Sequence, residues 1–129
     1  MDQKLAVFVS HLKDTAKFLL PHIDDWKLGQ KIWNGEKYDE YRGEEFKADP
    51  YARLWYSTLT VLAEMIERQE TKLTRRQSDF IERLLFGGMG SFNDYSLGTA
   101  FQQGVAEANQ ILDALRKTLY TTFKQLNAS

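Results

Sequence analysis

The segment Leu85-Phe86-Gly87-Gly88-Met89-Gly90-Ser91-Phe92-Asn93-Asp94 decides how this chain folds, because three glycines in four positions interrupt two strongly helical stretches. Glycine is used where the backbone needs a positive φ or a close approach, and it carries an entropic cost that ordinary loops avoid. Phe86, Met89 and Phe92 alternate with the glycines. This alternation predicts a glycine loop (residues 86–94) that packs into the body of the protein and fixes how two helices meet.

Helices are predicted on both sides of the glycine loop. Thr74 and Gln77 match a capping box, which starts a helix at 74 that ends near Phe86, with Gly87 as its left-handed C-terminal residue. This helix is expected to bury Phe80, Ile81, Leu84 and Leu85. After the loop, Asn93, Asp94 or Thr99 is expected to cap a last helix that reaches about Leu126. Its apolar stripe comprises Phe101, Val105, Ala108, Leu112, Leu115, Leu119, Phe123 and Leu126.

The N-terminal half contains two further long helices. Apolar residues at helical spacing predict an amphipathic helix from Asp2, its N-cap, to Leu20, where Pro21 ends or kinks it. Asp49 and Pro50 are a strong start signal for another long helix. The predicted buried stripe of that helix comprises Tyr51, Leu54, Trp55, Thr58, Leu59, Leu62, Ala63 and Ile66.

Between these two helices the pattern is irregular. One or two short helical turns are expected in residues 22–33, and a long acidic loop is expected in residues 34–49. No alternation typical of β-strands is present in the sequence. The chain is therefore predicted to be a single all-α domain (residues 1–129), a bundle of four main helices.

The composition of the chain limits the kinds of partner and the cellular location that we expect. The chain has 129 residues, a formal net charge of −1 and no cysteine, so nothing global attracts it to nucleic acid or to an anionic membrane. Neither a secretory signal nor a stretch of about 20 apolar residues is found. We therefore expect a cytoplasmic protein, monomeric or weakly dimeric, that binds neither nucleic acid nor a membrane.

The sequence contains no clear motif for catalysis, metal binding or phosphate binding. Only His11 and His22 are present, without the Glu-x-x-His spacing of a helical metal site, so neither a metal nor a cofactor is expected. The glycines lack the pattern and the lysine of phosphate-binding loops. Ser91 is not expected to be a nucleophile, because no histidine stands in a sequence context that suggests a general base. Asp94 is better explained as a helix-capping residue than as a catalytic one. A basic cluster comprises Lys72, Arg75, Arg76 and Arg83. It is interpreted as a solvated helix face, because base stacking would need aromatic residues among these charges and the aromatic residues lie instead on the apolar stripe or in other segments.

A partner-binding surface is predicted in the acidic and aromatic segment. Residues 22–50 carry eight acids and five bases, a net charge of −3. Aromatic anchors in a charged setting are typical of protein interfaces, although the aromatic side chains also fit the simpler role of pinning a crossover loop to the bundle. The candidate partner-binding residues are Trp33, Tyr38, Asp39, Glu40, Tyr41, Glu44 and Glu45.

The glycine loop resembles an FGGMGSFND-like signature shared by small bacterial proteins of the immunity type, which are encoded beside polymorphic toxins. The resemblance covers about residues 74–120. Its signature residues here are Phe86, Gly87, Gly88, Met89, Gly90, Ser91, Asn93 and Asp94. It implies a protein that binds and neutralises a cognate antibacterial toxin domain of a contact-dependent or type VI system. It implies no catalytic role for these residues.

The composition agrees with a stoichiometric inhibitor that has no small-molecule substrate and is not an enzyme. A ribonuclease would suit the acidic segment as the toxin, because nuclease clefts are basic and attract acidic partners. Two alternatives stay open. The first is a self-assembling helical adaptor or structural protein that uses the last helix as a dimer seam. The second is a helical enzyme, for which no constellation of ionisable groups is evident.

Overall fold

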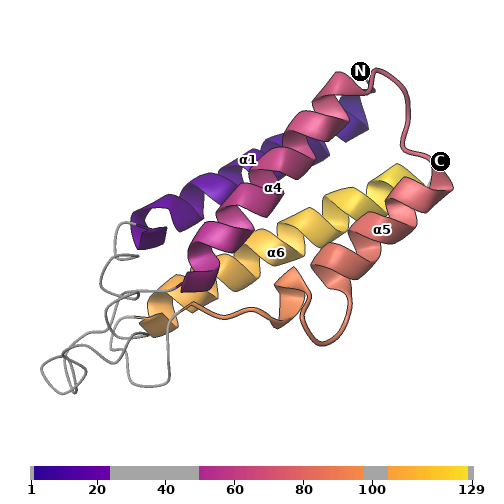
Figure 1. Cartoon of the computed structure of the whole chain (residues 1–129). Coiled ribbons are helices and arrows are strands. Elements are labelled where there is room, and N and C mark those ends of the chain that lie inside the picture. The colour runs from indigo at the N-terminus through magenta and orange to yellow at the C-terminus, as the bar shows by residue number, and fades with distance from the viewer. Residues whose placement is uncertain (1, 24–49, 98–104, 128–129) are drawn as a thin grey trace, which may run out of the picture.

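Four long helices make up the computed structural model, which describes residues 2–23, 50–97 and 105–127 (Figure 1). They are α1 (Gln3–Ile23), α4 (Pro50–Arg68), α5 (Arg75–Phe86) and α6 (Val105–Asn127), with a 3-10 turn, η1 (Phe92–Asp94), between the last two. No strand occurs in these residues. The predicted all-α bundle of four main helices is therefore confirmed.

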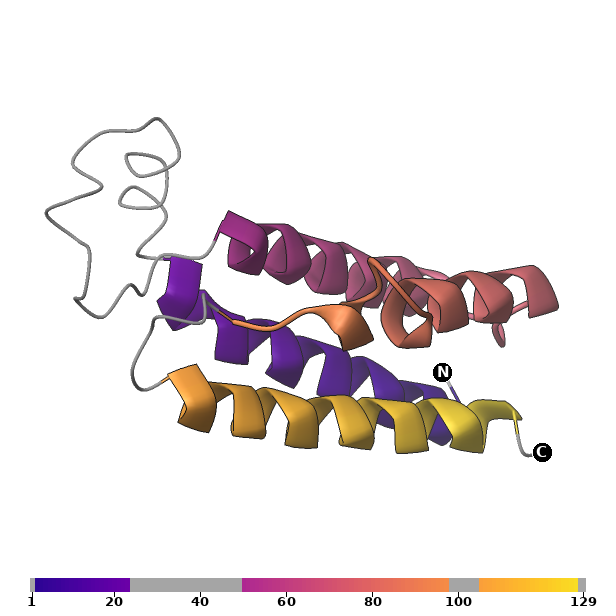
Figure 2. The ribbon, with the colours of Figure 1, turned by 90° about the horizontal axis from the view of Figure 1, so that it is seen from below.

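Consecutive helices run antiparallel, and the start of α1 lies at the same end of the bundle as the end of α6 (Figure 1). The helix α1 packs against both α4 and α6. In Figure 2, α4 and α5 lie in the upper layer, and α1 and α6 lie in the layer beneath them. Because α5 has only 12 residues, the segment 87–97 completes the fourth side of the bundle.

Local signals place the helix starts. The Asp2 carboxylate accepts the backbone N–H of Lys4 at 2.8 Å, as an N-cap residue does. Pro50 is the first residue of α4, where its missing N–H costs nothing. Thr74 and Gln77 form the predicted capping box, with Thr74 Oγ1 accepting the Gln77 N–H at 3.1 Å and Gln77 Oε1 accepting the Thr74 N–H at 2.9 Å.

The predicted end of the first helix at Leu20 is wrong, because α1 continues through Pro21 to Ile23. A proline removes one backbone donor, and its fixed φ is compatible with helix, so a helix near its end can continue for a few residues beyond it. The helical turns predicted for residues 22–33 therefore begin inside α1. From residue 24 onward these turns and the acidic loop of residues 34–49 lie outside the described residues.

The core lies where the four helices face one another. Its rings meet across helices: Phe8 of α1 and Phe86 of α5 lie 5.9 and 5.3 Å from Phe123 of α6, between ring centroids. The largest fully buried apolar side chains are Phe8, Leu12, Leu19, Leu59, Ile81, Leu85, Phe92, Leu112, Leu119 and Phe123. Every helix contributes to this set, so the four elements share one core.

The predicted buried stripe of α4 is partly wrong. Trp55, Leu59, Leu62, Ala63 and Ile66 are buried as expected, and so is Ala52, which was not predicted. In contrast, the side chains of Tyr51 and Leu54 are exposed and Thr58 is only half-buried. The physical reason is that α4 carries two apolar stripes one residue apart, and α1 covers only one of them.

Two predictions at the other end of the chain also need correction. Phe80 is exposed, whereas Ile81 and Leu85 of the same helix are buried. Asn93 and Asp94 belong to η1 and do not cap the last helix, which begins only at Val105. The third expected cap, Thr99, and the apolar Phe101 lie outside the described residues.

Candidate functional site

The tip of the glycine loop is a tight turn over residues 88–91. The Ser91 N–H donates to the Gly88 carbonyl at 3.1 Å, and Gly90 has a φ of +86°. These two features fit a type II β-turn, whose third residue needs a positive φ and is therefore usually glycine. Met89 takes the second position with its side chain 99% exposed. The expectation that Met89 packs into the body of the protein is therefore wrong.

The polar side chains of the loop bond the loop's own backbone. Ser91 Oγ donates to the Gly87 carbonyl at 2.8 Å, and the Asp94 carboxylate accepts the Gly90 N–H at 3.2 Å. Ser91 is also buried. Ser91 therefore ties the turn to the residue that follows α5, and Asp94 ties the turn to η1.

Gly87 serves a different purpose from the one predicted. Its φ of −75° is not left-handed, so the expected left-handed helix end at Gly87 is wrong. A Cβ atom at this position would lie 2.6 Å from the Arg83 carbonyl oxygen. Glycine is required here because the chain turns back closely over the last turn of α5.

An aromatic cluster anchors the loop to α4. The Trp55 ring lies 5.0 Å from Phe92 and 6.3 Å from Tyr95, between centroids, and all three side chains are buried. The predicted packing of Phe92 into the body is confirmed. Aromatic pairs at these distances add stabilisation beyond the area they bury, so the residues after the turn are firmly attached to the bundle.

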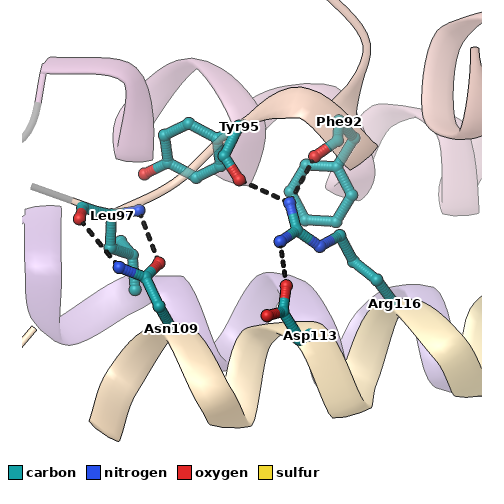
Figure 3. Close-up of polar contacts among 6 residues, drawn as sticks. All are labelled: Phe92, Tyr95, Leu97, Asn109, Asp113 and Arg116. Carbon is teal, nitrogen blue, oxygen red and sulfur yellow. Dashed lines mark hydrogen bonds and ion pairs between the residues drawn. The ribbon is translucent and has the colours of Figure 1, made fainter. Parts of the chain in front are cut away.

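A polar stripe on α6 holds the same segment from the other side. Asn109, Asp113 and Arg116 follow one another at i, i+4 and i+7, which places them on one face of the helix (Figure 3). Asn109 makes two hydrogen bonds with buried Leu97: its Oδ1 accepts the Leu97 N–H at 2.8 Å, and its Nδ2 donates to the Leu97 carbonyl at 3.2 Å. The side-chain amide of Asn109 thus satisfies both backbone polar groups of Leu97.

Arg116 is the centre of this stripe and only 7% exposed. Its Nη1 donates to the Phe92 carbonyl at 2.7 Å and to the Tyr95 carbonyl, and its Nη2 pairs with Asp113 (Figure 3). The guanidinium also lies 5.7 Å from the centroid of the Phe92 ring. Only the Nε atom, which is buried, has no hydrogen-bond partner. The backbone of a non-helical segment is thereby satisfied inside the bundle.

Sequence reasoning missed Arg116. It lies on the predicted apolar stripe of the last helix, four residues after Leu112 and three before Leu119, both fully buried. A charged residue on an apolar stripe is a signal for a buried polar contact, because a buried charge must be paired. The sequence did not reveal what the partner would be.

The predicted partner-binding residues Trp33, Tyr38, Asp39, Glu40, Tyr41, Glu44 and Glu45 all lie outside the described residues. The structure therefore neither brings them together nor separates them. The basic residues Lys72, Arg75, Arg76 and Arg83 are exposed, as a solvated face requires. Phe80 is exposed on the same helix as three of them.

Within residues 2–23, 50–97 and 105–127, no group of three or more His, Asp or Glu side chains is arranged to hold a metal ion. No helix in this part of the chain is long and apolar enough to cross a membrane. Comparison of the sequence and structure with known protein families, curated proteins and solved structures finds no match.

Proposed function

We propose that this protein is an immunity protein, which binds a cognate secreted toxin domain and neutralises it by one-to-one occlusion. The observation that carries the proposal is the role of the signature loop. The Ser91 hydroxyl and the Asp94 carboxylate bond the backbone of the loop itself. We therefore assign Ser91 and Asp94 of the signature loop a structural role, and we assign the function to the surface of the protein.

The acidic and aromatic segment remains the proposed contact surface. Its charge suits a basic partner such as a nuclease cleft, where carboxylates steer association and aromatic side chains act as anchors. It leads directly into α4, whose first turn exposes Tyr51.

The alternative of a self-assembling adaptor with a dimer seam on the last helix receives less support. The apolar stripe of α6 is used inside the bundle, where Phe123 packs on Phe8 of α1 and Leu112 and Leu119 are fully buried. A dimer seam on the last helix would have to compete with these contacts.

The test is protection of bacteria that express the toxin domain encoded beside this gene, together with the affinity of the purified pair at two salt concentrations. We expect a one-to-one complex that weakens at high salt. Tyr38→Ala and Tyr41→Ala should each weaken binding by about 2 kcal/mol, or about 30-fold, if they are central anchors. Glu44→Lys/Glu45→Lys should mainly slow association.

A matched control is Asp79→Lys/Glu82→Lys, which reverses two exposed acids on α5 and should leave affinity unchanged. Protection by amounts of protein far below those of the toxin would contradict occlusion. Unchanged affinity in all three segment variants would show that the binding surface lies elsewhere.

A further inference from the structure

Met89 differs from the other large apolar side chains on the surface of the described structure. It is 99% exposed, whereas the other exposed members of this class are only 39–60% exposed and so keep part of their area covered. Almost none of the Met89 side chain contacts the rest of the described residues. The fold therefore gains very little from an apolar side chain at this position.

The turn that carries Met89 is held without the help of that side chain. The hydrogen bonds of Ser91 and Asp94 described above run to the loop's own backbone. Directly after the turn, Phe92 is buried against Trp55 of α4. Met89 is thus displayed at the tip of a turn whose shape is already fixed. A contact made from such a turn costs less ordering on binding than one made from a flexible loop.

The glycines on either side of Met89 leave the backbone of the tip bare. Nothing lies within 4 Å of a Cβ atom placed at Gly88 or Gly90. Gly90 is explained by its φ of +86°, but Gly88 is not, because among the described residues Gly90 is the only glycine with a positive φ. A glycine that the fold itself does not require allows the backbone of another molecule to come close. Gly88 and Met89 together therefore indicate contact with a partner.

The charge of the loop suits the same kind of partner as the acidic and aromatic segment. Asp94 is the only charged residue in residues 84–97, and it is exposed. Residues 22–50 have the same sign, with a net charge of −3. Because opposite charges steer association, both parts of the chain favour a basic partner.

The residues that follow the turn are attached near the start of α4, which directly follows the acidic and aromatic segment. The helix α4 begins at Pro50, and Trp55 in its second turn contacts the rings of Phe92 and Tyr95. Residues 92–97 run from the glycine loop toward this end of α4 (Figure 1). One partner can therefore contact both the loop and the part of the segment that joins α4.

We propose that Met89 is an anchor of the interface with the toxin domain and enters an apolar pocket on that domain. The unbranched thioether side chain adapts readily to the shape of such a pocket, and the bare backbone at Gly88 lets the rim of the pocket come close. This inference rests on the proposed function, because it adds a second contact with the same partner.

The first experiment truncates the anchor. Isothermal titration calorimetry measures the affinity of the purified toxin domain encoded beside this gene for the parent protein and for Met89→Ala, which should bind at least about 10-fold more weakly. The melting temperature of the free protein should not change, because the Met89 side chain is 99% exposed. Met65→Ala is the matched control: Met65 is also exposed, but it lies near the other end of α4, so its truncation should leave the affinity unchanged.

The second experiment adds a side chain where the fold has room for one. Gly88→Gln should leave the melting temperature unchanged, because nothing lies within 4 Å of a Cβ atom at this position. It should weaken binding at least about 10-fold, because the added side chain obstructs the approach of the toxin domain. The matched control, Ala114→Gln, enlarges a small exposed residue on α6 and should bind like the parent.

The outcomes separate this inference from the proposed function. A parent protein that forms no complex with the toxin domain overturns both. A complex whose affinity is unchanged by either Met89→Ala or Gly88→Gln overturns only the anchor at the tip of the loop. Lower melting temperatures in these two variants would give the tip a role in the fold, and a dimer of the free protein that Met89→Ala abolishes would assign the tip to a second copy of the chain. Either result also overturns the proposed anchor.

Discussion

Three glycines follow α5 within four positions, and each has a different relation to its surroundings. Gly87 leaves no room for a Cβ atom beside the Arg83 carbonyl, whereas nothing lies within 4 Å of a Cβ atom at Gly88 or Gly90. Gly90 alone has a positive φ, of +86°. Steric conflict with backbone, strain at positive φ and open space can therefore be compared within one loop.

We predict that alanine substitutions rank in this order. Gly87→Ala should destabilise the protein by about 2 kcal/mol or more, because backbone must move to admit the methyl group. Gly90→Ala should cost about 1 kcal/mol for the left-handed conformation, and Gly88→Ala should lie within about 0.5 kcal/mol of the parent. Urea unfolding of the three variants measures the order. Equal stability of Gly87→Ala and Gly88→Ala would contradict the close approach at Gly87.

We expect Arg116 to stabilise the fold through the backbone carbonyls that it binds. Arg116→Met keeps much of the apolar volume but removes the donor of the Phe92 and Tyr95 carbonyls. Buried carbonyls without partners cost about 1–3 kcal/mol each, although removing a buried charge offsets part of this cost. We expect a net loss of about 2–4 kcal/mol in the free energy of unfolding.

Asp113→Asn is the control for Arg116→Met. Asp113 is 58% exposed in its side chain and pairs with the same guanidinium, so its loss should cost less than about 1 kcal/mol, as for other surface ion pairs. Chemical denaturation of both variants separates the two contributions. A similar, small loss in both would mean that the carbonyl contacts of Arg116 do not stabilise the fold.

The stability of α5 depends on its first turn. It buries only Ile81 and Leu85 completely, so local hydrogen bonds make up a large part of its stability. We predict that Thr74→Ala, which removes one half of the capping box, lowers the free energy of unfolding by about 1 kcal/mol. The measurement is thermal or urea unfolding followed by circular dichroism.

Thr118→Ala is the matched control for Thr74→Ala. The Thr118 hydroxyl is exposed and donates only to the Ala114 carbonyl of its own helix, at 3.1 Å, an interaction that hardly stabilises a helix. Its substitution should change stability by less than about 0.5 kcal/mol. If both variants lose the same amount, the capping box does not stabilise α5.

The helices of the bundle differ in how many apolar side chains they bury, so we expect them to differ in local stability. The helix α1 lies between α4 and α6 and buries six apolar side chains: Leu5, Phe8, Val9, Leu12, Ala16 and Leu19. The helix α5 is shorter and less buried. We predict that the amides of α5 exchange with deuterium faster than those of α1, because regions with fewer buried contacts open at lower free energy.

Hydrogen–deuterium exchange followed by mass spectrometry measures this difference. Peptides from the middle of α1 should show the slowest exchange, and peptides from α5 should exchange before the molecule unfolds as a whole. Equal protection of α1 and α5 would indicate that the bundle opens only as one cooperative unit. The helix α5 would then have the same local stability as the rest of the bundle.

The class of fold and most helix starts follow from the amino-acid sequence alone, since both depend on neighbours a few residues apart. The capping box at Thr74, the proline at Pro50 and the helical spacing of apolar residues are local features, and the structure contains each of them. The helical period shows which residues share a face. It does not show what covers that face.

Which apolar faces are buried, and how the loop is held, depends on how the helices pack together. The two stripes of α4 are similar in composition, and the position of α1 selects the one that contains Leu59 and leaves Leu54 outside. Arg116 contacts backbone more than 20 positions away in the sequence, a distance at which no local pattern identifies a partner. The exposure of Met89 and Phe80 follows from the same cause, because burial depends on elements that only the folded bundle brings together.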